Sequence, residues 1–246
     1  MMVRRGLRAA ADVILPRMCL VCGKRLLSDE SMMCVGCLSD MPYTRFWNMS
    51  HNPMSDKFND LLQRHPDTEE RGYAYASALF FYHSEADYRR IPYQIKYHGN
   101  TEAGRYFGRI LGNHLVASPL FVDVDMVIPV PLHWSRLWTR GYNQAACIAA
   151  GVADVMNVPL RQDILKRLRR TMTQTKLDIE KKMENVSGAF QIAKKFHVPE
   201  DCRHILIDDD VFTTGSTLYA CFAALRTVFP PSVRISVATL AYVGHL

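Results

Sequence analysis

The sequence lacks long hydrophobic runs, internal repeats and low-complexity tracts. None of its 246 residues lies in an apolar stretch of the roughly 20 residues that a helix needs to cross a bilayer. Arg8 and Asp12 interrupt the apolar character of the opening segment, and no small-residue cleavage site follows a signal-like core there. These absences argue against a membrane-spanning or secreted protein, so we expect a cytoplasmic globular protein that opens with a short amphipathic helix.

Acidic residues are scarce in one part of the chain. The formal net charge is +6, and the segment 161–182 carries eight basic residues against three acidic ones. An isolated run of this kind is ordinarily a solvated helix face, but beside an anion site it would bind ligand. The apolar content of 48% is enough for a substantial core, which predicts one main domain with a smaller appendage.

The seven cysteines form one paired group and three isolated positions. Two Cys-x2-Cys pairs with an eleven-residue spacer comprise Cys19, Cys22, Cys34 and Cys37. Two such pairs can bring four thiolates to about 2.3 Å from one zinc ion, with no open coordination position. The alternatives are two disulfides, which a reducing cytosol disfavours, or reduced core cysteines. We expect a structural Zn²⁺ site, and interpret Cys147, Cys202 and Cys221 as small apolar residues.

The rest of the chain divides into a linker and an α/β domain. Residues 1–45 hold the N-terminal helix and the cysteine pairs, and the polar segment 46–71 is predicted to be a linker. Residues 72–246 alternate strand and helix patterns, which predicts a parallel sheet flanked by helices. The predicted strands are 73–83, 122–130, 188–192, 205–207 and 232–243, and the predicted helices are 86–98, 102–116, 142–156 and 217–228.

The stretch HILIDDDVFTTGSTL, residues 204–218, joins a buried strand to a helix through three aspartates and a hydroxyl-rich turn. At such a helix start several backbone N–H groups lack partners and the helix dipole is positive, so a phosphate fits. The further donors are Thr213, Thr214, Ser216 and Thr217, and Gly215 lets the backbone approach closely. The carboxylates would repel that phosphate, but they suit ribose hydroxyls or a magnesium ion held through water. A sugar phosphate would bind both to the hydroxyl-rich turn and to the carboxylates. The alternative, a simple N-cap, needs only one residue and leaves the other acids and hydroxyls without a role.

Residues 209–217, DDVFTTGST, closely resemble the phosphoribosyl pyrophosphate (PRPP) signature of type I phosphoribosyltransferases. The resemblance implies that Asp209 and Asp210 hold the ribose 2′ and 3′ hydroxyls, which makes them the predicted catalytic acids. It also implies that the turn 213–217 cradles the 5-phosphate. Asp208 departs from the family, which usually has an apolar residue there. We expect Asp208 either to face solvent at the strand end or to add charge near the metal.

Other motifs are similar to the ComF branch of that superfamily, whose members pair an N-terminal four-cysteine zinc ribbon with this domain. They are PVPLHWSRLWTRGYNQA at 129–145, RLRRTMTQTKL and NVSGAF within 167–190, and IKYHG at 95–99. The resemblance spans nearly the whole chain and implies a type I phosphoribosyltransferase fold. Lys182 stands where an arginine is usual, so the charge is kept but the bidentate grip of arginine is lost.

A second basic loop follows the predicted strand 122–130. Ligands of open α/β sheets bind at the carboxyl edge, where this loop is expected. Arg140 and the backbone of Gly141 are therefore candidate pyrophosphate contacts, and the alternative is that Arg140 caps a neighbouring helix. By resemblance, the basic stretch 167–182 is the loop that closes over PRPP, with the candidate contacts Arg167, Arg169, Arg170 and Lys182.

Two classes of function follow from these patterns. The first is a magnesium-dependent glycosyltransferase of the pentosyl type, in which a nitrogen acceptor displaces pyrophosphate from C1 of the ribose. The second is a non-enzymatic protein that binds PRPP or single-stranded DNA and supports DNA uptake with competence-machinery proteins, as the ComF resemblance implies. Trp134 and Trp138 would then stack on bases, although such residues ordinarily pack in the core or the lid. The sequence does not identify the acceptor, because this superfamily recognises it through a variable hood, which here includes 73–99. Whether the protein forms a homodimer also stays open.

Overall fold

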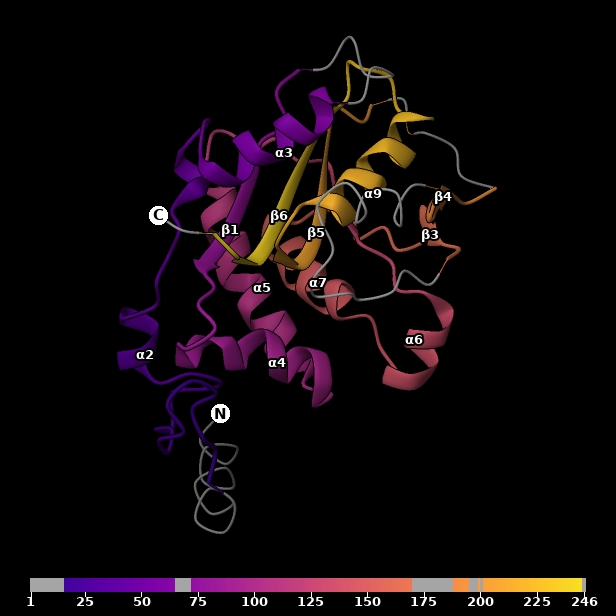
Figure 1. Ribbon diagram of the computed structural model, residues 1–246. Helices are drawn as coiled ribbons and strands as arrows, with labels where there is room; N and C mark the ends of the chain where they lie inside the picture. The colour runs from indigo at the N-terminus through magenta and orange to yellow at the C-terminus, as the bar shows by residue number, and fades with distance from the viewer. Residues whose placement is uncertain (1–15, 65–71, 170–187, 195–198, 200, 245–246) are drawn as a thin grey trace.

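A four-stranded parallel sheet forms the centre of the structure, with the strand order β1-β6-β5-β2 (Figure 1). The computed structural model describes residues 16–64, 72–169, 188–194, 199 and 201–244. The strands of the sheet are β1 (Ala76–Phe81), β2 (Met126–Pro129), β5 (His204–Phe212) and β6 (Arg234–Tyr242). The alternating pattern therefore predicted the α/β class and the parallel sheet correctly.

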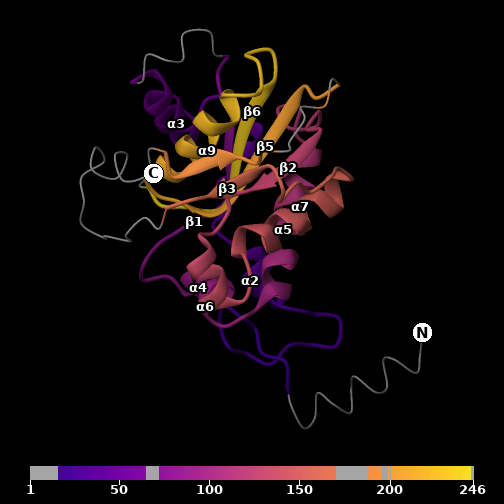
Figure 2. The same ribbon diagram turned by 90° about the vertical axis from the view of Figure 1, so that its right-hand side faces the viewer.

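Helices cover both faces of this sheet (Figure 2). On one face lie α3 (Pro53–Gln63) and α9 (Ser216–Arg226), and on the other lie α5 (Thr101–Val116) and α7 (Gln144–Met156). Ile205 and Ile207 of β5 join the core beneath α3 and α9, whereas Leu206 joins the core beneath α5 and α7. Successive strand residues point to opposite faces, and both faces are covered, so β5 and β6 are buried along almost their whole length.

The two helices α5 and α7 pack with their backbones in contact. A Cβ atom added at Gly108 would lie 2.1 Å from the carbonyl oxygen of Ile148, and one at Gly151 would lie 2.2 Å from the carbonyl oxygen of Arg105. No side chain fits at such distances, so glycine is required at both positions. The close approach holds α5 and α7 together as the layer that covers one face of the sheet.

The segment predicted to be a linker contains a buried helix instead of irregular chain. Phe46–Asn48 forms a short 3-10 helix, and α3 follows with Pro53 at its first position, where proline is favoured. Its apolar residues recur at helical spacing on one face and pack under the sheet: Met54, Phe58, Leu61 and Leu62. The prolines and polar residues of this segment therefore mark a helix start and a solvent face. Residues 65–71 lie outside the described residues, and the predicted domain limits stay a prediction.

Several other elements differ from the prediction in extent or pairing. β5 does not end at Ile207 but runs through the three aspartates to Phe212. The predicted helix 86–98 is a 3-10 turn, Asp87–Arg89, followed by α4 (Arg90–Tyr97). A further helix, α6 (Trp134–Arg140), was not predicted. The predicted strand 188–192 does not join the main sheet, because β4 (Phe190–Ile192) pairs antiparallel with β3 (Leu165–Arg167).

Some predicted features lie outside the described residues. These include the N-terminal helix and much of the predicted lid, with Arg170 and Lys182. In the part of the chain that the structure describes, no helix combines the length and the apolar character that a membrane crossing requires.

Replacement of Phe58 by alanine tests the packing of α3. The Phe58 side chain is fully buried, and its ring meets the Phe222 ring of α9 edge-on at 5.9 Å. We expect the Phe58→Ala variant to lose about 3–5 kcal/mol of unfolding free energy, because a cavity would remain. Urea denaturation followed by circular dichroism measures this loss. Gln63→Ala, at an exposed position of the same helix, is the control, and equal stability of both variants would contradict the packing described here.

Candidate functional site

The turn between β5 and α9 brings the predicted phosphate ligands together. Gly215 adopts the left-handed conformation, with φ 81°, immediately before Ser216 begins α9. A Cβ there would also lie 2.8 Å from the Phe212 ring, so conformation and space both require glycine. The Thr214 and Ser216 hydroxyls lie 2.9 Å apart, and the Thr214 hydroxyl accepts a long hydrogen bond, 3.5 Å, from the backbone N–H of Ser216, whereas the N-cap residue Gly215 has no side chain that could cap α9. The simple N-cap alternative therefore does not account for the hydroxyls of this turn.

The three aspartates lie inside β5 and are buried. Their exposed fractions are 0% for Asp208, 9% for Asp209 and 4% for Asp210. Asp210 forms an ion pair with Lys96 of α4, with 2.9 Å between Oδ2 and Nζ. Asp209 accepts a hydrogen bond from the backbone N–H of Asp210 at 2.9 Å. The two predicted catalytic acids are thus consecutive residues near the carboxyl end of β5, and their side chains leave the strand on opposite faces.

The position of Asp208 differs from both expectations. Its side chain is fully buried, and neither carboxyl oxygen has a hydrogen-bond partner among the described residues. Burial, with the charges of Asp209 and Asp210, raises the pKa of Asp208 well above its usual range. Asp208 therefore does not face solvent, and its surroundings disfavour the negative charge that was expected near the metal.

The charges of the two remaining acids are balanced by nearby cations. Burial and the neighbouring Asp210 raise the pKa of Asp209 to about 7, while Lys96 and Arg167 act in the opposite direction. Burial disfavours the charged form of Lys96, but the charges of Asp210 and Asp209 outweigh it and raise the pKa of this ammonium. Asp209 and Asp210 can consequently accept hydrogen bonds from neutral donors or bind a cation.

The predicted pyrophosphate loop lies beyond β2. The Arg140 guanidinium bonds the side-chain oxygen of Gln144, the first residue of α7, and lies 5.7 Å from the centre of the Tyr97 ring. Capping would require Arg140 to contact the carbonyl groups at the end of a helix. The observed contact is instead with the side chain of Gln144. Gly141 has φ 82° and ends α6, where its N–H donates to the Leu137 carbonyl at 2.7 Å. Binding of pyrophosphate by this N–H would need that hydrogen bond to open.

Two of the four candidate contacts in the predicted lid, Arg167 and Arg169, are described. Arg167 lies in β3, with its guanidinium 5.1 Å from the centre of the Phe190 ring. Burial and the charge of Arg136 lower its pKa, whereas Asp209 acts in the opposite direction, which places Arg167 in the electrostatic surroundings of the acid pair. Arg169 is exposed. The structure therefore associates Arg167, but not Arg169, with the predicted acids.

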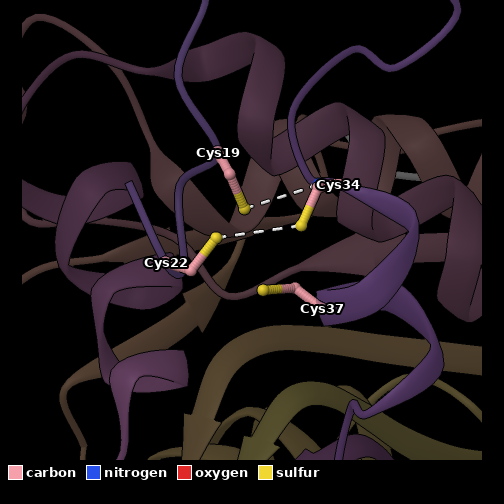
Figure 3. A group of neighbouring side chains, drawn as sticks. All are labelled: Cys19, Cys22, Cys34 and Cys37. Atoms are coloured by element: carbon pink, nitrogen blue, oxygen red, sulfur yellow. Dashed lines mark hydrogen bonds between the residues drawn. The ribbon is translucent and has the colours of Figure 1, made fainter. Parts of the chain in front are cut away.

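The four paired cysteines converge on one point (Figure 3). Their sulfur atoms all lie within 4.8 Å of one another, and the Sγ atoms of Cys22 and Cys34 are 3.8 Å apart. Four thiolates at zinc bond lengths of about 2.3 Å form a tetrahedron whose edges are close to this value, whereas a disulfide needs about 2.05 Å. Burial opposes ionisation of Cys19, but backbone N–H donors from Cys22 and Cys34 lower its pKa to about 7. The cluster can therefore hold a metal ion such as zinc.

The cysteine cluster is attached to the segment that carries Lys96. The Tyr88 hydroxyl donates to the carbonyl of Cys37 at 2.8 Å, and the Arg90 guanidinium donates to the carbonyl of Val21 at 2.9 Å. Cys37 lies in the short helix α2 (Val35–Ser39), while Tyr88 and Arg90 lie in and beside α4. The backbone of each cysteine pair is thus tied to the chain that leads into the candidate site.

Sequence reasoning missed two features of this region. Lys96 lies in the IKYHG motif, but no role was predicted for it; its charge partner is more than one hundred positions away, so only the fold reveals the pair. Trp134 and Trp138 are 67% and 88% exposed, which contradicts the expectation that they pack in the core. The expectation that they pack under the lid is not tested, because most of the lid is not described.

The central sheet, the strand-turn-helix site and the cysteine cluster define an α/β protein with an N-terminal four-cysteine cluster that can hold a metal ion. The chain is 35% identical over 112 residues to Competence protein F of Haemophilus influenzae, covering 45% of this chain and 48% of that protein. It is also 28% identical over 131 residues to the DNA utilization protein YhgH of Escherichia coli K12, covering 52% of this chain and 56% of that protein. These relatives confirm the resemblance to the ComF family, although the match spans only about half of their length. No family model matches the chain.

Metal analysis tests the cysteine cluster. We expect purified protein to contain one zinc ion per chain, because four thiolates complete one tetrahedral site. Replacement of Cys34 by serine should release the zinc and lower the melting temperature, since a closed site of this kind stabilises its fold. Atomic emission and a thiol-displacement assay measure the content. Cys147→Ser is the control, and metal loss in that variant or full retention in Cys34→Ser would contradict the assignment.

Proposed function

We propose that this chain is a ComF-like protein whose α/β domain binds PRPP with Mg²⁺ and transfers the phosphoribosyl group to a nitrogen acceptor. The observation that carries this proposal is the combination of a buried acid pair, Asp209 and Asp210, with the glycine turn at the start of α9. One half of this arrangement accepts hydrogen bonds and the other half donates them. A ligand with vicinal hydroxyls and a phosphate matches both.

In the proposed reaction, the turn 213–217 binds the 5-phosphate through backbone N–H groups and hydroxyls. Asp209 and Asp210 accept hydrogen bonds from the ribose hydroxyls and favour the positive charge that develops on the ring. Magnesium would neutralise part of the charge of the leaving pyrophosphate. Arg140 and Arg167 supply further positive charge at that end of the site. The bond from C1 to pyrophosphate breaks as the bond to the acceptor nitrogen forms, so no oxidant or reductant is needed.

The place of this activity in the cell follows from the relatives. Their names refer to competence and to DNA utilization. We infer that this chain likewise supports DNA uptake or use together with competence-machinery proteins. Structural zinc in the cysteine cluster would stabilise the N-terminal region and need not take part in the reaction.

A second candidate function, binding of single-stranded DNA, is favoured by the surface of α4 and α6. Within these two helices four residues are basic and none is acidic. Four aromatic side chains of the same helices are more than half exposed: Tyr93, Tyr97, Trp134 and Trp138. Stacking side chains interspersed with cations are typical of surfaces that bind single strands.

Calorimetric titration of PRPP, with and without Mg²⁺, tests the first candidate. We expect magnesium-dependent binding that the Asp209→Asn, Asp210→Asn double variant weakens at least about tenfold, because hydrogen bonds to charged acceptors are lost. Asp60→Asn, at an exposed position of α3, is the matched control. Wild-type affinity in the double variant, or no binding by folded wild type, would count against a PRPP site. A subsequent acceptor screen for released pyrophosphate tests turnover.

Fluorescence titration of an oligothymidylate tests the second candidate. We expect the Trp134→Ala, Trp138→Ala double variant to bind at least about thirtyfold more weakly, because two stacks of about 1–3 kcal/mol each are lost. Affinity should also fall as salt rises, since phosphate contacts release counterions. Val122→Ala removes an exposed apolar side chain outside both helices and serves as the control. Salt-independent binding, or equal affinity in all variants, would exclude this function.

A further inference from the structure

The last turn of α4 contacts both the acid pair and the loop between β2 and α7. Lys96 Nζ lies 2.9 Å from Asp210 Oδ2, at the carboxyl end of β5. The next residue, Tyr97, lies under the guanidinium of Arg140, and the preceding residue, Ile95, accepts a hydrogen bond from the Tyr142 hydroxyl through its carbonyl. Three consecutive residues of α4 thus join the acid pair to the loop between β2 and α7.

The ion pair between Lys96 and Asp210 occupies an acceptor that the ribose would need. A carboxylate has two oxygens, and Lys96 already uses one of those on Asp210. The ammonium is a compact charge on a flexible four-carbon stem, so it can change partners without movement of the backbone. Its side chain is 28% exposed, whereas that of Asp210 is 5% exposed, so the lysine is the partner with access to solvent and to a ligand.

We infer that Lys96 is a further ligand-binding residue, which pairs with Asp210 in the free protein and turns to the diphosphate group of the bound ligand. This inference rests on the proposed function, because it assigns a residue to the same site. The exchange leaves both oxygens of Asp210 for the ribose hydroxyls. It also keeps a positive charge between the acid pair and the diphosphate, which would otherwise repel one another.

The neighbours of Lys96 favour this exchange. Arg140, a candidate contact of the diphosphate, lies against the ring of the adjacent Tyr97. The Tyr142 hydroxyl fixes the backbone at Ile95, so the turn that carries Lys96 is held beside that loop. Both contacts place the turn that carries Lys96 next to the loop that is the candidate site of the diphosphate.

Titration of inorganic pyrophosphate in the presence of Mg²⁺ tests the inference, because this probe lacks the ribose. We expect Lys96→Met to weaken pyrophosphate binding at least about tenfold and Lys96→Arg to restore much of it, since a charged hydrogen bond is lost and then replaced. Asp210→Asn should retain or strengthen pyrophosphate binding, because it releases Lys96, while it weakens binding of PRPP. Lys194→Met, at an exposed lysine outside the candidate site, is the control.

The outcomes separate this inference from the proposed function. If wild type binds pyrophosphate through Lys96 but does not bind PRPP, the inference stands and the proposed function fails. If PRPP binds through the acid pair and Lys96→Met leaves pyrophosphate affinity within about twofold, Lys96 is only a counter-ion and the inference fails. Failure of wild type to bind pyrophosphate also overturns it.

A second variant guards against loss of the fold. Lys96→Met leaves Asp210 buried without its cation, which is destabilising. The Lys96→Met, Asp210→Asn double variant removes both charges and should restore the melting temperature, yet it should still bind pyrophosphate weakly. Recovery of pyrophosphate affinity along with stability would show that Lys96 acts only through the fold.

Discussion

Repulsion among three consecutive buried carboxyl groups is the constraint on which the arrangement of the site depends. Three ionised carboxylates in such a place would repel one another strongly, because little solvent screens them. The protein meets this constraint differently at each position. Burial raises the pKa of Asp208 and so disfavours its charge, Asp210 is paired with Lys96, and the pKa of Asp209, raised to about 7 by burial and Asp210, is lowered in part by the Arg167 charge. The elements around the carboxyl end of β5, namely α4 and the β3-β4 pair, are those that supply these cations.

The parts of the molecule that the sequence predicted are those with local causes. The glycine turn at 213–217 was found because a left-handed residue, hydroxyls and a helix start are encoded in adjacent positions. The cysteine cluster was predicted because two cysteines separated by two residues can both bind one ion, and the sequence contains two such pairs. The parallel sheet followed from the alternation of strand and helix patterns, which reflects burial of both faces.

The parts that were not predicted depend on partners distant in sequence. The amphipathic pattern of α3 is visible only once Pro53 is recognised as a helix start, and the antiparallel pairing of β3 with β4 joins residues more than twenty positions apart. Asp208 resembled a surface acid because its burial depends on neighbouring strands. The pairing of Lys96 with Asp210 and the exposure of Trp138 are likewise properties of the packed molecule, not of any local pattern.

The hydrogen bonds from Tyr88 and Arg90 to the cysteine segment have a practical meaning for biochemistry on this protein. They make the N-terminal region part of the mechanical support of α4, and α4 carries the lysine that faces the acid pair. Chelating buffers, affinity resins that strip metal, and oxidation during storage act on a cysteine cluster that these two hydrogen bonds connect to α4. Binding assays on this protein therefore require that the metal content and the thiol state of each preparation be determined.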